Sequence, residues 1–158
     1  MISPDNINRI LIAVEDSPYS DQAIHYGMLL AKRLGAKIAL VHADDIAIST
    51  PYIADPMLSE TPLMIPEIMH IQEEASKSLF ERIHEQYGGD IEIKNYRRVG
   101  RAQDEILAVA EEYKADLIIL GTHGRTGLDH FISGSVSESV ARKANCPVMI
   151  VPKRDSVK

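Results

Sequence analysis

The residues best suited to chemistry form a glycine-rich stretch that follows an apolar run. It reads Gly121-Thr122-His123-Gly124-Arg125 and continues to Gly134-Ser135-Val136-Ser137. Glycine leaves room for a ligand to approach the backbone, and the free N–H groups and dipole at a helix start attract an anion. Arg125 would add a positive charge and the two serines hydroxyl donors. The pattern predicts a phosphate site, which we name the glycine loop (residues 121–137).

Helix capping is a second explanation for part of this stretch. Ser135 and Glu138 have the spacing of a capping box, in which each side chain bonds the other's backbone N–H group. Capping explains Ser135, but it does not explain three glycines. On spacing alone, both explanations stay open.

An acidic pair follows the first apolar run, in the sequence Glu15-Asp16-Ser17. In an open parallel sheet, ligands bind beyond the carboxyl ends of the strands, where the strand order reverses. There Glu15 could accept from ribose hydroxyls or hold a divalent cation bound to phosphates. Asp16 and Ser17 could instead cap the helix that follows.

Five short apolar runs alternate with amphipathic stretches, which is typical of an α/β fold wound around a parallel sheet. The apolar runs are residues 10–14, 37–43, 91–96, 117–120 and 148–151. Apolar residues at helical spacing predict helices over residues 24–34, 68–83, 106–113 and 136–144. The sequence therefore predicts an open five-stranded parallel sheet with helices on both faces.

Length and composition limit the classes of protein. The chain has 158 residues, of which 45% are hydrophobic, so we expect a single domain over residues 1–158. It lacks a run of about 18 apolar residues and the features of a signal peptide, so we expect a cytoplasmic protein without a membrane partner. A net charge of −6 argues against nucleic acid as a partner. The single cysteine, Cys146, is expected to be a small buried residue.

Residues 44–66 interrupt the regular pattern. Four prolines fall in this segment, at positions 51, 56, 62 and 66, and they exclude a long regular helix. The segment is predicted to be a long crossover loop within the domain. A lid or partner surface is the alternative, because loops of this length are often functional.

The sequence resembles the universal stress protein family over residues 9–152. Its ATP-binding members carry a glycine, two residues, a glycine, nine residues, a glycine and then serine or threonine. Here Gly121, Gly124, Gly134 and Ser135 have this spacing. The resemblance implies a Rossmann-like sheet in the order 3-2-1-4-5, and ATP, with Mg²⁺ or Mn²⁺, between the first and fourth strands.

The resemblance also implies roles for individual residues. Ala13, Val14 and Glu15 would flank the nucleotide, and Val41 or Ala43 would touch adenine. The ribose and phosphates would be received by Gly121, His123, Gly124, Arg125, Gly134, Ser135, Val136 and Ser137. Glu15 stands where the family usually has aspartate, and its carboxylate is the candidate for a metal contact. The apolar strand at residues 147–152 implies a homodimer, because family members commonly pair there.

These features favour an ATP-binding stress or signalling protein with at most weak ATPase activity. The alternative is a dimeric interaction module of the same fold that binds no nucleotide. A receiver domain would need a phosphate-accepting aspartate after the third strand, where the sequence has Lys94-Asn95-Tyr96-Arg97. A dedicated enzyme is not supported, because His123 and His130 have no orienting partner in the sequence and a Walker lysine is missing. No catalytic residue is therefore assigned.

Overall fold

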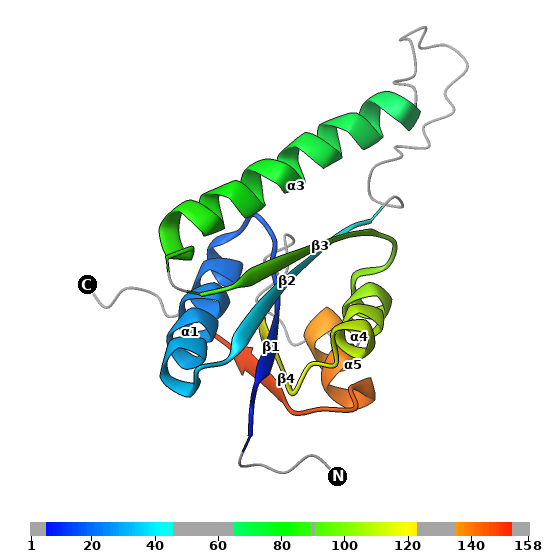
Figure 1. Cartoon of the computed structure of the whole chain (residues 1–158). Helices are drawn as coiled ribbons and strands as arrows, with labels where there is room; N and C mark the ends of the chain where they lie inside the picture. Colours follow the sequence, from blue (N-terminus) through cyan, green and yellow to red (C-terminus); the bar gives the residue numbers. More distant parts are fainter. Residues whose placement is uncertain (1–5, 46–64, 90, 123–134, 153–158) are drawn as a thin grey trace, which may run out of the picture.

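The computed structural model describes residues 6–45, 65–89, 91–122 and 135–152 (Figure 1). Its strands are β1 (Arg9–Ala13), β2 (Lys37–Asp44), β3 (Ile93–Val99), β4 (Leu117–Gly121) and β5 (Val148–Val151). Its helices are α1 (Pro18–Leu34), α3 (Ile65–Tyr87), α4 (Ala102–Tyr113) and α5 (Val136–Lys143).

The strands form one parallel sheet in the order β3-β2-β1-β4-β5. This confirms the predicted fold class and strand order. The chain first winds from β1 outward to β3 and then crosses back to place β4 on the other side of β1. The strand order therefore reverses between β1 and β4, and the carboxyl ends of these two strands lie side by side at one edge of the sheet.

Two helices cover each face of the sheet (Figure 1). Because side chains alternate along a strand, neighbouring residues of one strand enter different cores. On the α1 and α3 face, the buried core includes Ile10, Ile12, Ile24, Met28, Leu79 and Ile83. On the α4 and α5 face, it includes Leu11, Val41, Ile106, Val109, Ile118 and Val140.

Helix α1 is longer than its apolar repeat predicts, and both of its ends are set by local chemistry. The Ser17 side chain accepts a hydrogen bond from the backbone N–H of Ser20, and Pro18 occupies the first turn, where its missing N–H costs nothing. Gly35 ends the helix with φ of 67°, a left-handed conformation that glycine adopts without strain.

The predicted crossover segment at residues 44–66 is shorter in the structure at both ends. Asp44 is the last residue of β2, and Pro66 lies in the first turn of α3, where proline is tolerated. Residues 46–64 lie outside the described part of the chain.

Strand β3 begins and ends later than the predicted run at residues 91–96. It extends to Val99 through Arg97 and Arg98, because an edge strand accepts charged side chains that an apolar pattern misses. Among the described residues, no helix has the length and apolar character that crossing a bilayer requires.

Burial at the junction of β1 and β4 predicts that two Ile→Ala substitutions differ greatly in their effect on the free energy of unfolding. Ile119 pairs with Ile12 across this junction and is 0% exposed, whereas Ile71 on α3 is 61% exposed. We expect Ile119→Ala to lower the free energy of unfolding by about 2–5 kcal/mol, because it leaves a cavity. Ile71→Ala should change it by less than about 0.5 kcal/mol. Equal losses in urea titrations would contradict the assigned core.

Candidate functional site

The predicted site residues of β1 and β2 lie at the carboxyl edge of the sheet. Ala13 ends β1 and pairs with Val41 of β2, and the Val14 N–H donates to the Val41 carbonyl at 2.9 Å. Gly121 ends β4, the strand on the other side of β1. The structure thus brings the predicted residues of three strands to the place where the strand order reverses.

The accessibility of the β2 residues separates the two candidates for the adenine contact. Val41 is 1% exposed and belongs to the core under α4. Ala43, two residues further along the same face, is partly exposed. Of the two side chains, only Ala43 is accessible to a ligand in the described structure.

The carboxylate of Glu15 is already hydrogen-bonded within its own turn. The Ser17 hydroxyl donates to Glu15 Oε1 at 2.8 Å and also accepts from the Ser20 N–H at 3.3 Å. Ser17 therefore caps α1, which is one of the two roles predicted for it. No group of three side chains suited to a metal ion occurs among the described residues, so Glu15 belongs to no such group there.

Asp16 and its neighbour Glu15 have different partners. Arg82 of α3 pairs with Asp16 at 3.3 Å and with Asp21 of α1 at 3.2 Å.

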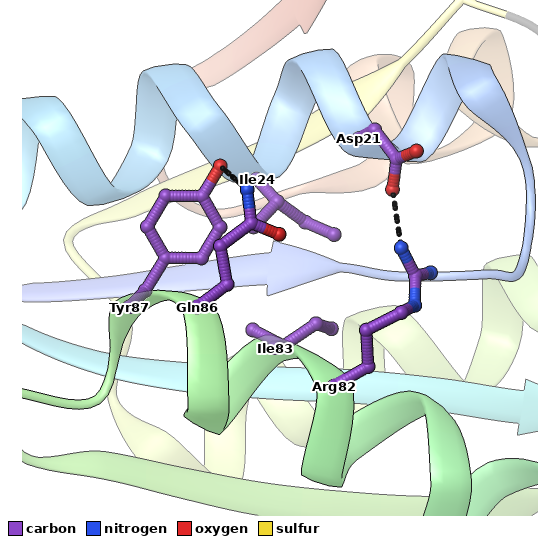
Figure 2. A pocket seen from close by; sticks show the side chains of 6 residues that line it. All are labelled: Asp21, Ile24, Arg82, Ile83, Gln86 and Tyr87. Carbon is purple, nitrogen blue, oxygen red and sulfur yellow. Dashed lines mark hydrogen bonds and ion pairs between the residues drawn. The ribbon is translucent and has the colours of Figure 1, made fainter.

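A small pocket of about 100 Å³ lies between α1 and α3. Figure 2 shows Arg82 and Asp21 paired beside it. Its lining residues are Asp21, Ile24, Arg82, Ile83, Gln86 and Tyr87, so none of the predicted site residues lines it. A wider groove lies between α3 and β3, lined by residues that include Phe80, His84 and Arg97.

Gly121 has a packing role that the sequence did not indicate. A Cβ atom at this position would lie 2.8 Å from the carbonyl oxygen of Tyr19 in α1. Among the described residues, the glycines with a positive φ are Gly35 and Gly100. Gly121 is not one of them, so its backbone conformation does not require glycine. Gly121 is therefore required by the close approach of α1 to β4, whatever it does for a ligand.

The start of α5 shows one of the two bonds of the predicted capping box, the one accepted by Ser135. The Ser135 hydroxyl accepts from the Glu138 N–H at 3.2 Å and lies 3.2 Å from the Ser137 hydroxyl. Glu138 Oε1 accepts from Arg142, one turn along the helix. Val136 is exposed and Ser137 is buried. The N–H groups of Val136 and Ser137 belong to the first turn, where helices leave donors without an intrahelical partner. His123, Gly124, Arg125 and Gly134 lie outside the described residues.

A buried polar network at the end of β2 was not predicted. His42 Nδ1 lies 2.8 Å from the Val14 carbonyl, and its Nε2 lies 3.2 Å from Asp44 Oδ1. Asp44 also accepts from Arg97 Nε at 2.8 Å and from the Ser76 hydroxyl at 3.3 Å. The only signal in the sequence is that polar residues occupy positions 42 and 44 of an otherwise apolar strand.

The three arginines near the end of β3 are paired in the structure. Arg97 bonds buried Asp44, Arg98 pairs with Glu112, and Arg101 lies 3.8 Å from Asp104. They therefore do not form a free basic patch. Cys146 is partly buried, and burial raises the pKa of its thiol, with Asp116 as a second cause. The expectation of a buried residue is therefore met only in part.

Comparison with known proteins gives a consistent family and fold. A family model described as the universal stress protein family matches residues 6–152. Universal stress protein MJ0531 of Methanocaldococcus jannaschii is 31% identical over 145 residues, which cover 92% of this chain and 82% of that protein.

Two solved structures are similar in fold. Hypothetical protein MJ0577, also from Methanocaldococcus jannaschii, has a TM-score of 0.77 at 24% identity, over 95% of this chain and 99% of that one. The universal stress protein of Archaeoglobus fulgidus in complex with dAMP has a TM-score of 0.57 at 22% identity, over 95% and 98%.

The contact between Gly121 and Tyr19 predicts a loss of stability that needs no ligand. Gly121→Ala should lower the free energy of unfolding of the nucleotide-free protein by about 1–3 kcal/mol, because the backbone of α1 must shift. Gly89→Ala is the matched control, since a Cβ atom at Gly89 would meet no atom within 4 Å. Chemical denaturation measures both variants. Equal stability of the two would refute the close packing.

Proposed function

The chain belongs to the universal stress protein family, and from that premise we propose that it binds ATP where β1, β4 and the start of α5 meet. The observation that carries the proposal is the reversal of strand order between β1 and β4, next to a glycine loop with unbroken family spacing. Open parallel sheets bind ligands at such reversals. In this proposal, nucleotide binding serves a stress or signalling response.

Two features of the described residues support an adenine nucleotide as the ligand. The partly exposed Ala43 offers an apolar contact for a base, and the first-turn N–H groups of α5 offer donors for phosphate. A relative of the same fold, from Archaeoglobus fulgidus, has been solved in complex with dAMP. We propose that the glycine loop, including His123, Gly124, Arg125 and Gly134, receives the ribose and phosphates.

Glu15 retains the capacity for a second partner. A carboxylate has about four acceptor positions, and the bond from Ser17 uses one of them at Oε1. The remaining positions suit a ribose hydroxyl or a Mg²⁺ or Mn²⁺ ion bound to the phosphates. The proposed activity is binding, with at most slow hydrolysis of ATP.

One observation favours the alternative, a dimeric interaction module that binds no nucleotide. Gly121 packs against Tyr19, and Ser135 caps α5, so both residues have structural roles without a ligand. Such roles do not explain the other two glycines of the pattern. A binding measurement decides between the two functions.

ATP is expected to stabilise the protein. When free ATP exceeds its dissociation constant a hundredfold, linkage contributes about 2.7 kcal/mol, which raises the melting temperature by about 5–10 °C. Differential scanning fluorimetry with ATP and Mg²⁺ measures the shift. Tripolyphosphate should give a smaller shift, because it lacks the base and ribose. The proposal fails if ATP, ADP and AMP all leave the melting temperature unchanged.

Two glycine variants test whether the ATP-induced shift in melting temperature depends on the glycine loop. Gly124→Val is expected to abolish the shift by filling space that the nucleotide needs. Gly89→Val is the matched control, at a glycine with open surroundings, and it should respond to ATP as the natural protein does. Equal shifts in both variants would exclude Gly124 from the site.

We further propose a homodimer that pairs through β5. This strand is an edge of the sheet, and its Met149 and Ile150 side chains are 38% and 39% exposed. The opposite edge, β3, carries the exposed Lys94, and a lysine on an edge strand discourages strand pairing. The apolar edge is therefore the one suited to a second copy.

The dimer can be tested by placing a charge on the apolar edge. Ile150→Lys should convert the protein from dimer to monomer, because the two lysines would meet in a desolvated interface. Ile71→Lys, at an exposed isoleucine of α3, is the control and should leave the association unchanged. Sedimentation equilibrium measures the mass. A dimer that persists in Ile150→Lys contradicts pairing through β5.

A further inference from the structure

One peptide group at the end of β1 is hydrogen-bonded at both of its polar atoms by side chains. Its carbonyl, from Val14, lies 2.8 Å from His42 Nδ1, and its N–H, from Glu15, donates to the Ser20 hydroxyl at 2.9 Å. Ser20 is 3% exposed and His42 is 9% exposed. The peptide is thus held between β2 and α1 by two buried groups.

Each nitrogen of the His42 ring faces an oxygen atom. A carbonyl oxygen only accepts hydrogen bonds, so Nδ1 must carry the proton that it shares with Val14. The other nitrogen lies 3.2 Å from Asp44 Oδ1, and Asp44 is itself fixed by Arg97 and Ser76. A carboxylate oxygen is also an acceptor, so a hydrogen bond to Asp44 needs a proton on Nε2 as well. With both bonds made, the ring is held between Val14 and Asp44.

We propose that His42 and Ser20 are positioning residues for nucleotide binding, because they fix the Val14–Glu15 peptide. The inference rests on the proposed function, in which Val14 and Glu15 flank the ATP. A peptide that is already fixed loses no freedom when the ligand arrives, and such preorganisation strengthens binding. Neither side chain needs to touch the nucleotide for this effect.

Two substitutions of His42 separate positioning from mere packing. Asn places its amide nitrogen where Nδ1 lies, so His42→Asn keeps a donor for the Val14 carbonyl. Gln places its amide nitrogen where Nε2 lies, so His42→Gln keeps the contact with Asp44 and loses the one with Val14. Both variants remove the ring, so both lose packing, and the nitrogen that remains is the main difference.

The ATP affinity of the two variants is expected to differ. His42→Asn should bind ATP within about threefold of the natural protein, and His42→Gln about tenfold more weakly, the factor of one hydrogen bond of ordinary strength. Isothermal titration calorimetry measures both. Hydrogen exchange of the Glu15 amide without nucleotide should be faster in His42→Gln than in His42→Asn.

A second pair of variants keeps the test decisive if a His42 variant does not fold. Ser20→Ala removes the acceptor of the Glu15 N–H, and Ser78→Ala removes an exposed hydroxyl from α3 as the control. Ser20→Ala should weaken ATP binding several-fold, and Ser78→Ala should not change it.

The outcomes distinguish this inference from the proposed function. If the natural protein binds ATP and His42→Gln and Ser20→Ala bind it equally well, the positioning role is overturned and the proposed function stands. An affinity that falls equally in His42→Asn and His42→Gln also overturns the positioning role. If the natural protein binds no adenine nucleotide, the proposed function fails and the positioning role fails with it.

Discussion

The burial of the three central residues of β1 is the constraint on which the rest of the structure depends. Ile10, Leu11 and Ile12 are each 0% exposed, because helices cover both faces of the strand and another strand pairs with each edge. A strand in this position can bear polar groups only where it ends. The end of β1 is therefore where Glu15 can meet a polar ligand, and where α1, β2 and β4 must all supply hydrogen bonds or close contacts.

Much of the fold could be predicted from the sequence, and the differences have local causes. The five apolar runs became the five strands, and the family resemblance supplied their order. The predicted β3 was displaced because its second half carries Arg97 and Arg98, whose charges are tolerated only at an edge. Helix α3 begins earlier than its apolar repeat because Pro66, which reads as a helix breaker, fits a first turn.

The candidate site was less predictable because its decisive contacts join residues distant in sequence. The packing of Gly121 on Tyr19 and the bond from Arg97 to Asp44 depend on the tertiary fold, which periodicity does not reveal. Capping by Ser17 and Ser135 was predictable, since it acts within three residues. The roles of His123 and Gly124 remain predictions, because these residues lie outside the described part of the chain.

The unequal edges of the sheet limit how the protein can assemble. Two copies that meet at β5 by twofold symmetry would leave a β3 strand at each outer end. There Lys94 and Arg98 flank the Tyr96 ring, and the exposed charge of Lys94 would oppose a third copy. In the proposed dimer, edge-to-edge association would stop at two copies. The apolar edge β5 would allow pairing, and the charged edge β3 would prevent the formation of filaments.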